Sequence, residues 1–234
     1  MAKLMIIKSE NNAKCGNNCP KKRNKAVFFA GFFIGLFLAL TYAVKFYDVA
    51  AIGPNGSTIG LSAINALVRD FVGINQNFYA ISEKLGLVAI AVAGCICLAW
   101  FLRLFSKAKR ADRTFGAYIV LMVLMAASYV LFEKVVINYR PVLINGVLEA
   151  SFPSSHVLLS MCTLGGAAYV FGTKIKGGFL RFLTVFISVA TLIAIVALRT
   201  MSGVHWASDI LGGLLLSAAW LAVFVALCKK QKRS

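Results

Sequence analysis

The chain has 234 residues, of which 60% are hydrophobic and only 14% are charged, and its mean hydropathy is +0.81. A water-soluble domain carries about 25% charged residues, so this composition leaves too little polar surface for a soluble globule. The formal net charge of +17 at pH 7 would suit a nucleic-acid-binding protein. The basic residues lie in short segments beside apolar runs, however, so we expect a lipid bilayer and no nucleic acid as partner.

The chain begins with a polar, basic stretch, residues 1–25, which is densest in lysine and arginine between positions 21 and 25. We interpret it as a cytoplasmic tail whose cations attract anionic lipid headgroups by about 1 kcal/mol each. Cys15 and Cys19 are spaced in a way that faintly resembles a metal site. No second pair and no histidine lies nearby, so we expect neither a metal nor another cofactor.

Uncharged windows of 17 to 19 residues recur along the rest of the chain. A helix needs roughly 20 residues to cross the hydrocarbon core, and helices satisfy their own backbone hydrogen bonds in lipid. The first window is longer than the apolar core of a signal peptide, so we expect it to be retained. The sequence predicts an all-α, polytopic membrane protein with one membrane-embedded domain, residues 26–234, and six spans: Ala26–Val44, Leu85–Leu102, Thr114–Phe132, Val157–Thr173, Phe182–Leu198 and Ile210–Cys228.

The distribution of charge predicts the orientation of these spans. With the N-terminus inside, the inner segments are 1–25, 103–113, 174–181 and 229–234, and they hold 19 of the 25 lysines and arginines. Six of the eight acidic residues fall on the other side, whose net charge is then zero. Cytoplasmic loops are enriched in lysine and arginine, so we expect both termini inside.

The longest outer segment, residues 46–84, connects the first and second spans. Residues 53–56 read Gly-Pro-Asn-Gly, which indicates a turn. Ile64, Leu67 and Phe71 then recur at the spacing of one helical face, while Asn65 and Arg69 lie off it. This pattern predicts an outer amphipathic helix that either rests on the bilayer surface or packs on the transmembrane bundle.

Polar residues also gather at the outer ends of the later spans. The two histidines of the chain, His156 and His205, each lie at the start of a predicted helix, and Asp209 follows His205 by four residues. On one helix that spacing places His205 and Asp209 on the same face, where a carboxylate orients an imidazole and strengthens it as a nucleophile. His156 is suited to protonating a leaving oxygen near neutral pH.

Three outer cations, Lys134, Arg140 and Arg199, lie at the same helix ends as the histidines. A single outer arginine usually extends to the headgroups, but this concentration indicates a site for an anion. Guanidinium groups match the geometry of phosphate. Acyl transfer would require a serine or cysteine nucleophile and an oxyanion hole instead. The pattern therefore favours phosphoryl chemistry.

In order and spacing these residues resemble the signature of the type 2 phosphatidic acid phosphatase (PAP2) superfamily, in its integral membrane lipid phosphatase branch. Arg199, five residues, His205, three residues and Asp209 match its third motif, and residues 153–156, Pro-Ser-Ser-His, match the second with Ser155 in place of glycine. The first motif departs: Lys134 and Arg140 are separated by five residues where the family has six, and Glu133 stands at the lysine position. Leu198 replaces the serine that precedes the arginine.

The resemblance implies a metal-independent mechanism. His205 would form a phosphohistidine, oriented by Asp209, and His156 would protonate the leaving group. The phosphoryl oxygens would be held by Lys134, Arg140, Ser154, Ser155 and Arg199.

The resemblance also implies a lipid phosphate or lipid pyrophosphate as substrate. Undecaprenyl pyrophosphate and phosphatidylglycerol phosphate are favoured over phosphatidic acid and lipid A. The expected location is the bacterial cytoplasmic membrane, with the site on the outer side. Alternatives are a non-catalytic lipid-binding or transport protein and a vanadate-dependent peroxidase, whose known members are soluble. The oligomeric state is left open.

Overall fold

The computed structural model describes residues 19–105 and 112–229. Within these ranges the regular structure is helical, with isolated β-bridges and no strand. Six helices are long and apolar enough to cross a membrane, which confirms the predicted all-α fold with six spans. Five spans lie in single helices, α2 (Cys19–Phe46), α4 (Gln76–Phe105), α5 (Arg113–Lys134), α8 (Gly178–Met201) and α9 (Ala207–Cys228).

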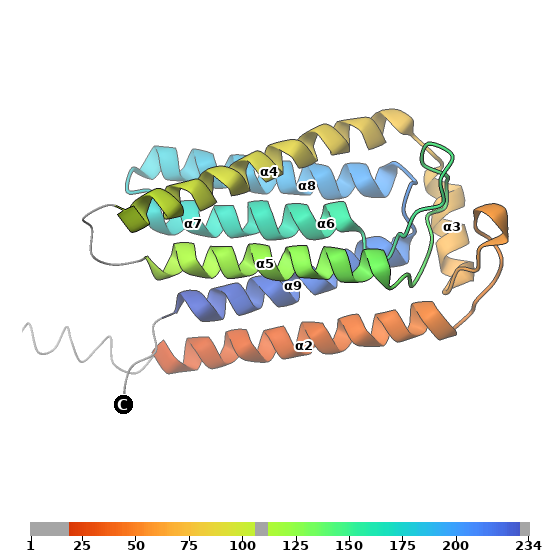
Figure 1. Ribbon diagram of the computed structural model, residues 1–234, viewed down its shortest axis with the longest axis horizontal. Coiled ribbons are helices and arrows are strands. Elements are labelled where there is room, and N and C mark those ends of the chain that lie inside the picture. The colour runs from red at the N-terminus through yellow and green to blue at the C-terminus, as the bar shows by residue number, and fades with distance from the viewer. Residues whose placement is uncertain (1–18, 106–111, 230–234) are drawn as a thin grey trace, which may run out of the picture.

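The fourth span consists of three consecutive helical segments (Figure 1): α6 (Ser155–Ser160), the π-helical segment η2 (Met161–Gly165) and α7 (Gly166–Lys174). A π-helical turn changes the backbone hydrogen-bonding pattern of the helix that contains it. Here the fully buried Tyr118 of α5 donates its hydroxyl to the carbonyl of Thr163, at 3.0 Å. This hydrogen bond ties α5 to the irregular part of the fourth span.

Two helices begin well before the uncharged windows that predicted them. Helix α2 begins at Cys19 and not at Ala26, and α4 begins at Gln76 and not at Leu85. An uncharged window marks only the part that crosses hydrocarbon, while a helix continues into the interface, where charged side chains reach water. Of the predicted tail, residues 1–18, including Cys15, lie outside the described ranges.

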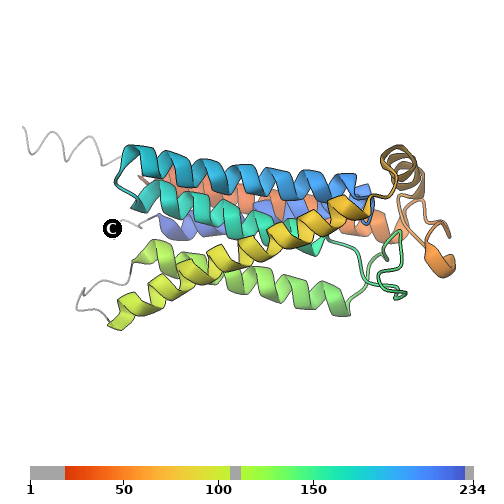
Figure 2. The same cartoon turned by 90° about the horizontal axis from the view of Figure 1, so that it is seen from above.

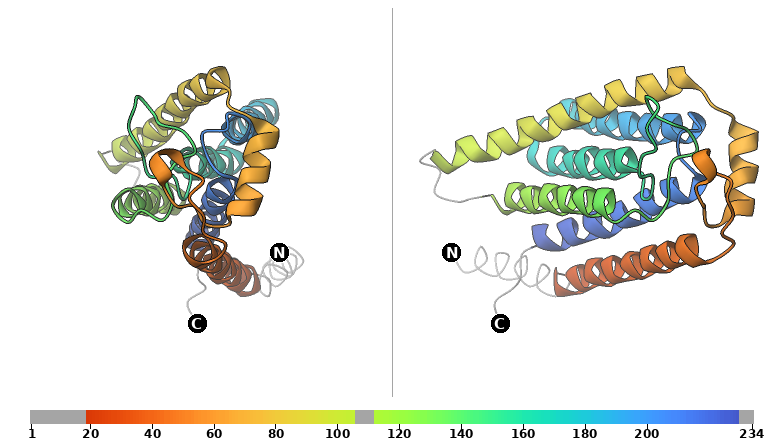
Figure 3. Two further views of the ribbon diagram at one scale, coloured as in Figure 1. Left: turned by 90° about the vertical axis from the view of Figure 1, so that its right-hand side faces the viewer. Right: turned by 45° about the vertical axis from the view of Figure 1, so that its right-hand side comes forward.

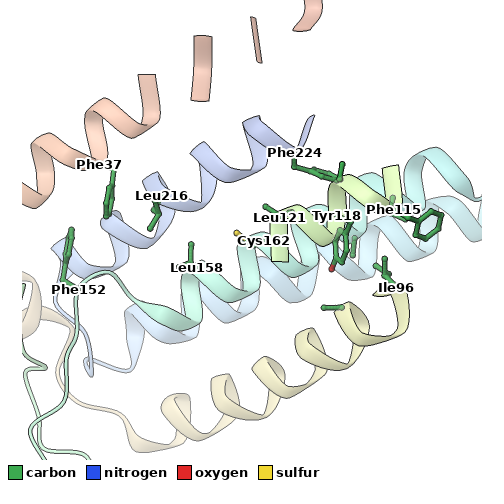
Figure 4. Close-up of a cluster of buried hydrophobic side chains, with 14 of the residues drawn as sticks. Phe37, Ile96, Phe115, Tyr118, Leu121, Phe152, Leu158, Cys162, Leu216 and Phe224 are labelled. Atoms are coloured by element: carbon green, nitrogen blue, oxygen red, sulfur yellow. The ribbon is translucent and has the colours of Figure 1, made fainter. Parts of the chain in front are cut away.

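The spans run side by side as a bundle, with α4 inclined to the others (Figure 2). Helix α9 packs against both α2 and α5. A buried apolar cluster that includes Phe37, Leu158, Leu216 and Phe224 fills the space between these helices (Figure 4). Phe152 belongs to this cluster and stacks on Phe37 with ring centroids 5.8 Å apart. Because Phe152 precedes the second motif directly, the core anchors that motif.

A short helix, α3 (Ser62–Val72), lies across the end of the bundle where the longer connections gather (Figures 1 and 3). Its polar side faces the bundle: Asn65 is fully buried, donates to Ser208 Oγ at 3.0 Å and accepts the Ser208 backbone N–H at 3.1 Å. Leu67 and Phe71 on the other side are 70% and 91% exposed. The helix therefore packs on α9 through its polar face and leaves its apolar face outside.

Candidate active site

Residues of all three motifs meet at the end of the bundle that α3 crosses. Arg140 lies in the connection between α5 and α6, and His156 lies in the first turn of α6. Arg199 lies in the last turn of α8, while His205 and Asp209 flank the start of α9. The fold thus brings together residues that are as many as 69 positions apart in the sequence, from Arg140 to Asp209.

Two glycines allow the close packing that shapes this end of the bundle. Gly203, between Arg199 and His205, has φ +67° and approaches the Gly73 carbonyl so closely that a Cβ would lie 1.9 Å from its oxygen. Only glycine adopts that conformation without strain. On α9, a Cβ at Gly213 would lie 3.0 Å from the Ser154 carbonyl oxygen. The second motif therefore lies directly against α9, where the Ser154 N–H donates to the Asp209 carbonyl at 2.9 Å.

His205 and Asp209 are connected through a third residue, Ser151. The distance from His205 Nδ1 to Asp209 Oδ2 is 3.7 Å, too long for a hydrogen bond. The Ser151 hydroxyl donates a short hydrogen bond to Asp209 Oδ2 and lies 3.1 Å from His205 Nδ1. The Trp206 backbone N–H also donates to Asp209 Oδ2, at 2.9 Å. Asp209 is therefore fixed at the start of α9 and reaches the imidazole through Ser151.

These contacts favour the tautomer of His205 that carries its proton on Nδ1. A hydroxyl has one hydrogen; when Ser151 donates it to an ionised Asp209, Ser151 Oγ can accept from the Nδ1–H of His205. The lone pair of His205 Nε2 then accepts from Arg140 Nη1, 3.3 Å away, and becomes available when Arg140 donates to a bound anion instead. The nitrogen suited to attack is thus placed beside a guanidinium group.

Burial lowers the pKa of His205 well below its ordinary value, and the positive charges of Arg140 and Arg199 lower it further. The ring lies in the short connection before α9, with its side chain only 1% exposed. An imidazole with a lowered pKa is unprotonated at neutral pH. His205 therefore keeps the lone pair that a nucleophile needs.

A second group of contacts joins His156, Arg199 and Glu83. Glu83 extends from α4, and its Oε1 lies 3.1 Å from His156 Nε2. Arg199 Nη2 donates a short hydrogen bond to the same carboxylate oxygen. The Arg199 guanidinium also lies over the ring of Tyr79, with its Cζ 4.8 Å from the ring centroid. The Arg199 side chain is completely buried by these contacts.

Several buried polar atoms at this site form no hydrogen bond within the described part of the protein. Among them are Nε and Nη1 of Arg199, the hydroxyl of Ser154, Nδ1 of His156 and Oδ1 of Asp209. Buried polar groups are nearly always satisfied, so unpaired N–H donors on a buried cation indicate a place for an anion. A phosphoryl group offers several oxygens that accept such donors.

A cavity of about 560 Å³ opens beside these groups. The polar residues toward the motifs are Tyr79, Glu83, Glu133, Arg140, Glu149, Ser151, Ser155 and His156. The rest of its wall is mostly apolar and comes from α4, α5 and α6: Ile90, Met125, Ala126, Tyr129, Phe132, Leu158 and Leu159. The cavity thus combines a polar end, which contains both Arg140 and acidic side chains, with an apolar wall between transmembrane helices.

Most of the residues predicted for the site lie together at this end of the bundle. Arg140, Ser155 and His156 line the cavity, and Ser154, Arg199, His205 and Asp209 are buried around it. Lys134 is different: it ends α5 with an exposed side chain, outside the cavity wall, whereas Glu133 lies in that wall. Successive helical residues point about 100° apart. The first motif is one residue shorter than in the family, so the Lys134 side chain points away from the cavity.

Three polar residues of the site were not predicted from the sequence. Ser151 lies two residues before Pro153 of the second motif, and this proximity was the only sequence feature that linked it to the site. Glu149 forms an ion pair with Arg140, with Oε2 3.0 Å from Nε. Glu83 reaches Arg199 across 116 positions of the chain. Contacts over such separations depend on how the helices pack, which no local pattern shows.

The sequence model described as the PAP2 superfamily matches residues 133–233, the part of the chain that contains all three motifs. Among solved structures, the fold is similar to "Crystal structure of the first transmembrane PAP2 type phosphatidylglycerolphosphate phosphatase from Bacillus subtilis". That match has a TM-score of 0.56 and 15% sequence identity and covers 85% of this chain and 94% of the other. A search of curated proteins gave no significant match.

The fold and the site thus define an integral membrane protein whose described residues include six candidate membrane-spanning helices, with a site that contains histidines and arginines at one end. The family match and the structural match confirm the PAP2 resemblance that the three motifs predicted.

Proposed function

We propose that this protein is a lipid phosphate or lipid pyrophosphate phosphatase that works through a phosphohistidine on His205. The observation that carries the proposal is the arrangement around His205. Its Nε2 lies 3.3 Å from a nitrogen of the Arg140 guanidinium, its Nδ1 lies 3.1 Å from the Ser151 hydroxyl, and buried donors of Arg199 lack partners.

In the first step, the lone pair of His205 Nε2 attacks phosphorus, and the bond from phosphorus to the leaving oxygen breaks. The leaving oxygen takes a proton from His156, while Arg140, Arg199, Ser154 and Ser155 donate to the phosphoryl oxygens. The phosphorylated imidazole is cationic, and the negative charge of Asp209, transmitted through Ser151, stabilises it. Donors that are already in position at the start of the reaction do not have to be reorganised during it.

In the second step, water attacks phosphorus and the P–N bond breaks. His156, now neutral, takes the proton from the water and is ready to protonate the next leaving group. Inorganic phosphate leaves, and His205 recovers its lone pair. None of the steps requires a metal ion, and the described residues include no group of three or more His, Cys, Asp and Glu side chains placed to hold one.

The cavity supports a lipid as substrate. Its apolar wall lies between α4, α5 and α6, below the polar end that contains His156 and Arg140. A lipid whose phosphate lies at the polar end would place the first part of its tail along this wall and keep the rest in the bilayer. Sites for small ligands usually measure about 300–1,000 Å³, so a cavity of about 560 Å³ holds the headgroup region of a lipid and only part of its tail.

We place the site on the outer face of a bacterial cytoplasmic membrane. In the described residues, cations outnumber acids at the opposite end of the bundle, where Asp112 is the acid, whereas the two kinds are equal in number at the site end. The positive-inside rule then puts the site outside. The exposed apolar face of α3, with Leu67 and Phe71, would lie on the outer leaflet.

Among lipids, phosphatidylglycerol phosphate and undecaprenyl pyrophosphate are the substrates that we favour. The solved structure of similar fold is described as a phosphatidylglycerolphosphate phosphatase. That protein is only 15% identical to this chain, so the substrate has to be determined directly.

The test is phosphate release by the purified protein in detergent micelles, with phosphatidic acid, phosphatidylglycerol phosphate and undecaprenyl pyrophosphate as substrates. We expect His205→Ala and Asp209→Asn to abolish turnover while the protein stays folded, and a chelator to leave turnover unchanged. Full activity in His205→Ala would falsify the assignment of the nucleophile. Loss of activity with a chelator, restored by one divalent ion, would contradict the metal-independent mechanism.

A non-catalytic lipid-binding or transport role is the second candidate, because Lys134 of the first motif lies outside the cavity wall. The same experiment separates the two. A folded wild-type protein that binds these lipids and releases no phosphate from any of them supports the non-catalytic role.

A further inference from the structure

Glu83 lies at the position that the proposed mechanism assigns to the phosphate group of the substrate. Its carboxylate accepts from Arg199 Nη2 and lies 3.1 Å from His156 Nε2. These are two of the groups that the proposed mechanism assigns to the phosphoryl group and its leaving oxygen. A carboxylate oxygen and a phosphoryl oxygen both accept hydrogen bonds from guanidinium and imidazole groups. Glu83 therefore occupies a position that suits a substrate oxygen.

The remaining donors around Glu83 show that the carboxylate satisfies the anion site only in part. Nε and Nη1 of Arg199 and the hydroxyl of Ser154 remain without partners. A carboxylate has two oxygens, whereas a phosphoryl group presents three to a ring of donors. A bound phosphate would thus satisfy donors that Glu83 leaves unpaired, provided that the carboxylate moves aside.

Glu83 is placed so that it can move. Its side chain is 40% exposed, whereas that of its partner Arg199 is completely buried. It lies in the cavity wall near the outer end of α4 and reaches the site from outside the three motifs. Rotation about its flexible side-chain bonds would carry the carboxylate into the open cavity without a change in the helix.

We propose that Glu83 competes with phosphate for Arg199 and His156. This inference rests on the proposed phosphatase site. A free phosphate ion has to displace the carboxylate with its own binding energy alone, so it binds weakly and leaves readily as product. A lipid substrate also gains binding energy from its tail in the cavity and the bilayer, which offsets the displacement of Glu83. Glu83 thus weakens the binding of the free phosphate product, while a lipid substrate still binds through its tail.

The test measures the binding of inorganic phosphate to the purified full-length chain in detergent micelles by titration calorimetry. Glu83→Gln keeps the shape of the side chain and removes its charge, and Glu83→Ala removes the competing group. If Glu83 occupies the site about nine-tenths of the time, its removal should lower the phosphate Kd about tenfold. Asp70→Asn is the matched control, since Asp70 is an exposed acid on α3 at the same end of the bundle and does not line the cavity. We expect its Kd to stay within about twofold.

An unchanged phosphate Kd in both Glu83 variants would overturn the proposal, and so would an equal decrease in Asp70→Asn. Kinetics provide a second readout, because a residue that only positioned His156 would lower kcat on removal and leave the phosphate Kd unchanged. The binding experiment does not depend on turnover. Tighter phosphate binding in the variants of a protein that hydrolyses no lipid would support the competition and contradict the phosphatase. Lipid hydrolysis with an unchanged phosphate Kd would contradict the competition alone.

Discussion

At the scale of single residues, Ser151 is the link between the proposed nucleophile and its carboxylate. Its hydroxyl lies between His205 Nδ1 and Asp209 Oδ2, which are 3.7 Å apart. We expect Ser151→Ala to lower kcat by about 100-fold, because His205 would lose the acceptor that holds its Nδ1–H and fixes its tautomer. The measurement is phosphate release from the preferred lipid at saturating substrate.

The control for this change is Ser160→Ala, which removes another fully buried hydroxyl, one that donates only to the Val157 carbonyl, at 3.2 Å. It should leave kcat within about threefold of the wild type, as expected for a side chain outside the reacting groups. A double variant, Ser151→Ala with Asp209→Asn, should have a kcat little lower than that of Asp209→Asn alone, because Asp209 acts on His205 through the Ser151 hydroxyl. Multiplicative losses would show that Ser151 and Asp209 act separately.

The residues of the site were predictable to the extent that they lie in local patterns. His205 and Asp209 share a helix start, and His156 follows a Pro-Ser-Ser sequence, so spacing alone indicated them. Composition could not show where the Lys134 side chain points. A change of one residue in the spacing of the first motif turns a helical side chain by about 100°. Glu83 was missed because its contacts depend on the packing of α4 against α6 and α8.

At the scale of helices, Asp112 joins the start of α5 to the end of α7. Its carboxylate accepts from the Thr114 backbone N–H at 3.0 Å and forms an ion pair with Lys174, whose Nζ lies 2.7 Å from Oδ2. Asparagine caps a helix as well as aspartate does, so Asp112→Asn removes the ion pair alone, worth about 0.2–1 kcal/mol. Asp112→Ala also removes the cap and should cost about 1 kcal/mol more. Thermal unfolding in detergent at pH 7 should show Tm falling in that order.

The same pair predicts a dependence of stability on pH. Burial raises the pKa of Asp112, but hydrogen bonds from Lys174 and the Thr114 N–H outweigh it, so the pKa is lowered overall. A carboxyl with a lowered folded-state pKa contributes stability that is present above the unfolded value, about 3.9, and is lost as pH falls through the folded value. The Tm difference between wild type and Asp112→Asn should therefore persist at pH 6 and vanish in strong acid. A difference that grows on acidification would contradict the assignment.

The helices themselves were predicted well, and their ends less well. Uncharged windows located all six spans because lipid excludes charge from the hydrocarbon core. The windows ended where the first charge appeared, so they omitted the outer part of α4 that carries Glu83. The π-helical segment η2 had no sequence signal, since it reflects how α5 and the fourth span pack around Tyr118 and Thr163.

At the scale of the whole molecule, the candidate active site and the excess of positive charge lie at opposite ends of the bundle. The histidines, Arg140 and Arg199 lie at one end, with acids and cations equal in number there. The described part of the other end is rich in cations: Lys25, Arg103, Arg113, Lys174, Lys176, Arg181 and Lys229. Cytoplasmic loops are enriched in lysine and arginine, so we propose that this end faces the cytoplasm. The site would then face outward, and the lipid phosphates available to it would be those of the outer leaflet.

This orientation is testable with single cysteines in a background that lacks the six native ones. Asn145 is an exposed residue in the connection that carries Arg140, and Lys176 is exposed in the turn between α7 and α8 at the other end. A membrane-impermeant thiol reagent applied to intact cells should label Asn145→Cys and should label Lys176→Cys only after the membrane is opened. The reverse pattern would put the site in the cytoplasm. It would also make inner-leaflet lipids the substrates, because a site at the end of the bundle reaches only the leaflet that it faces.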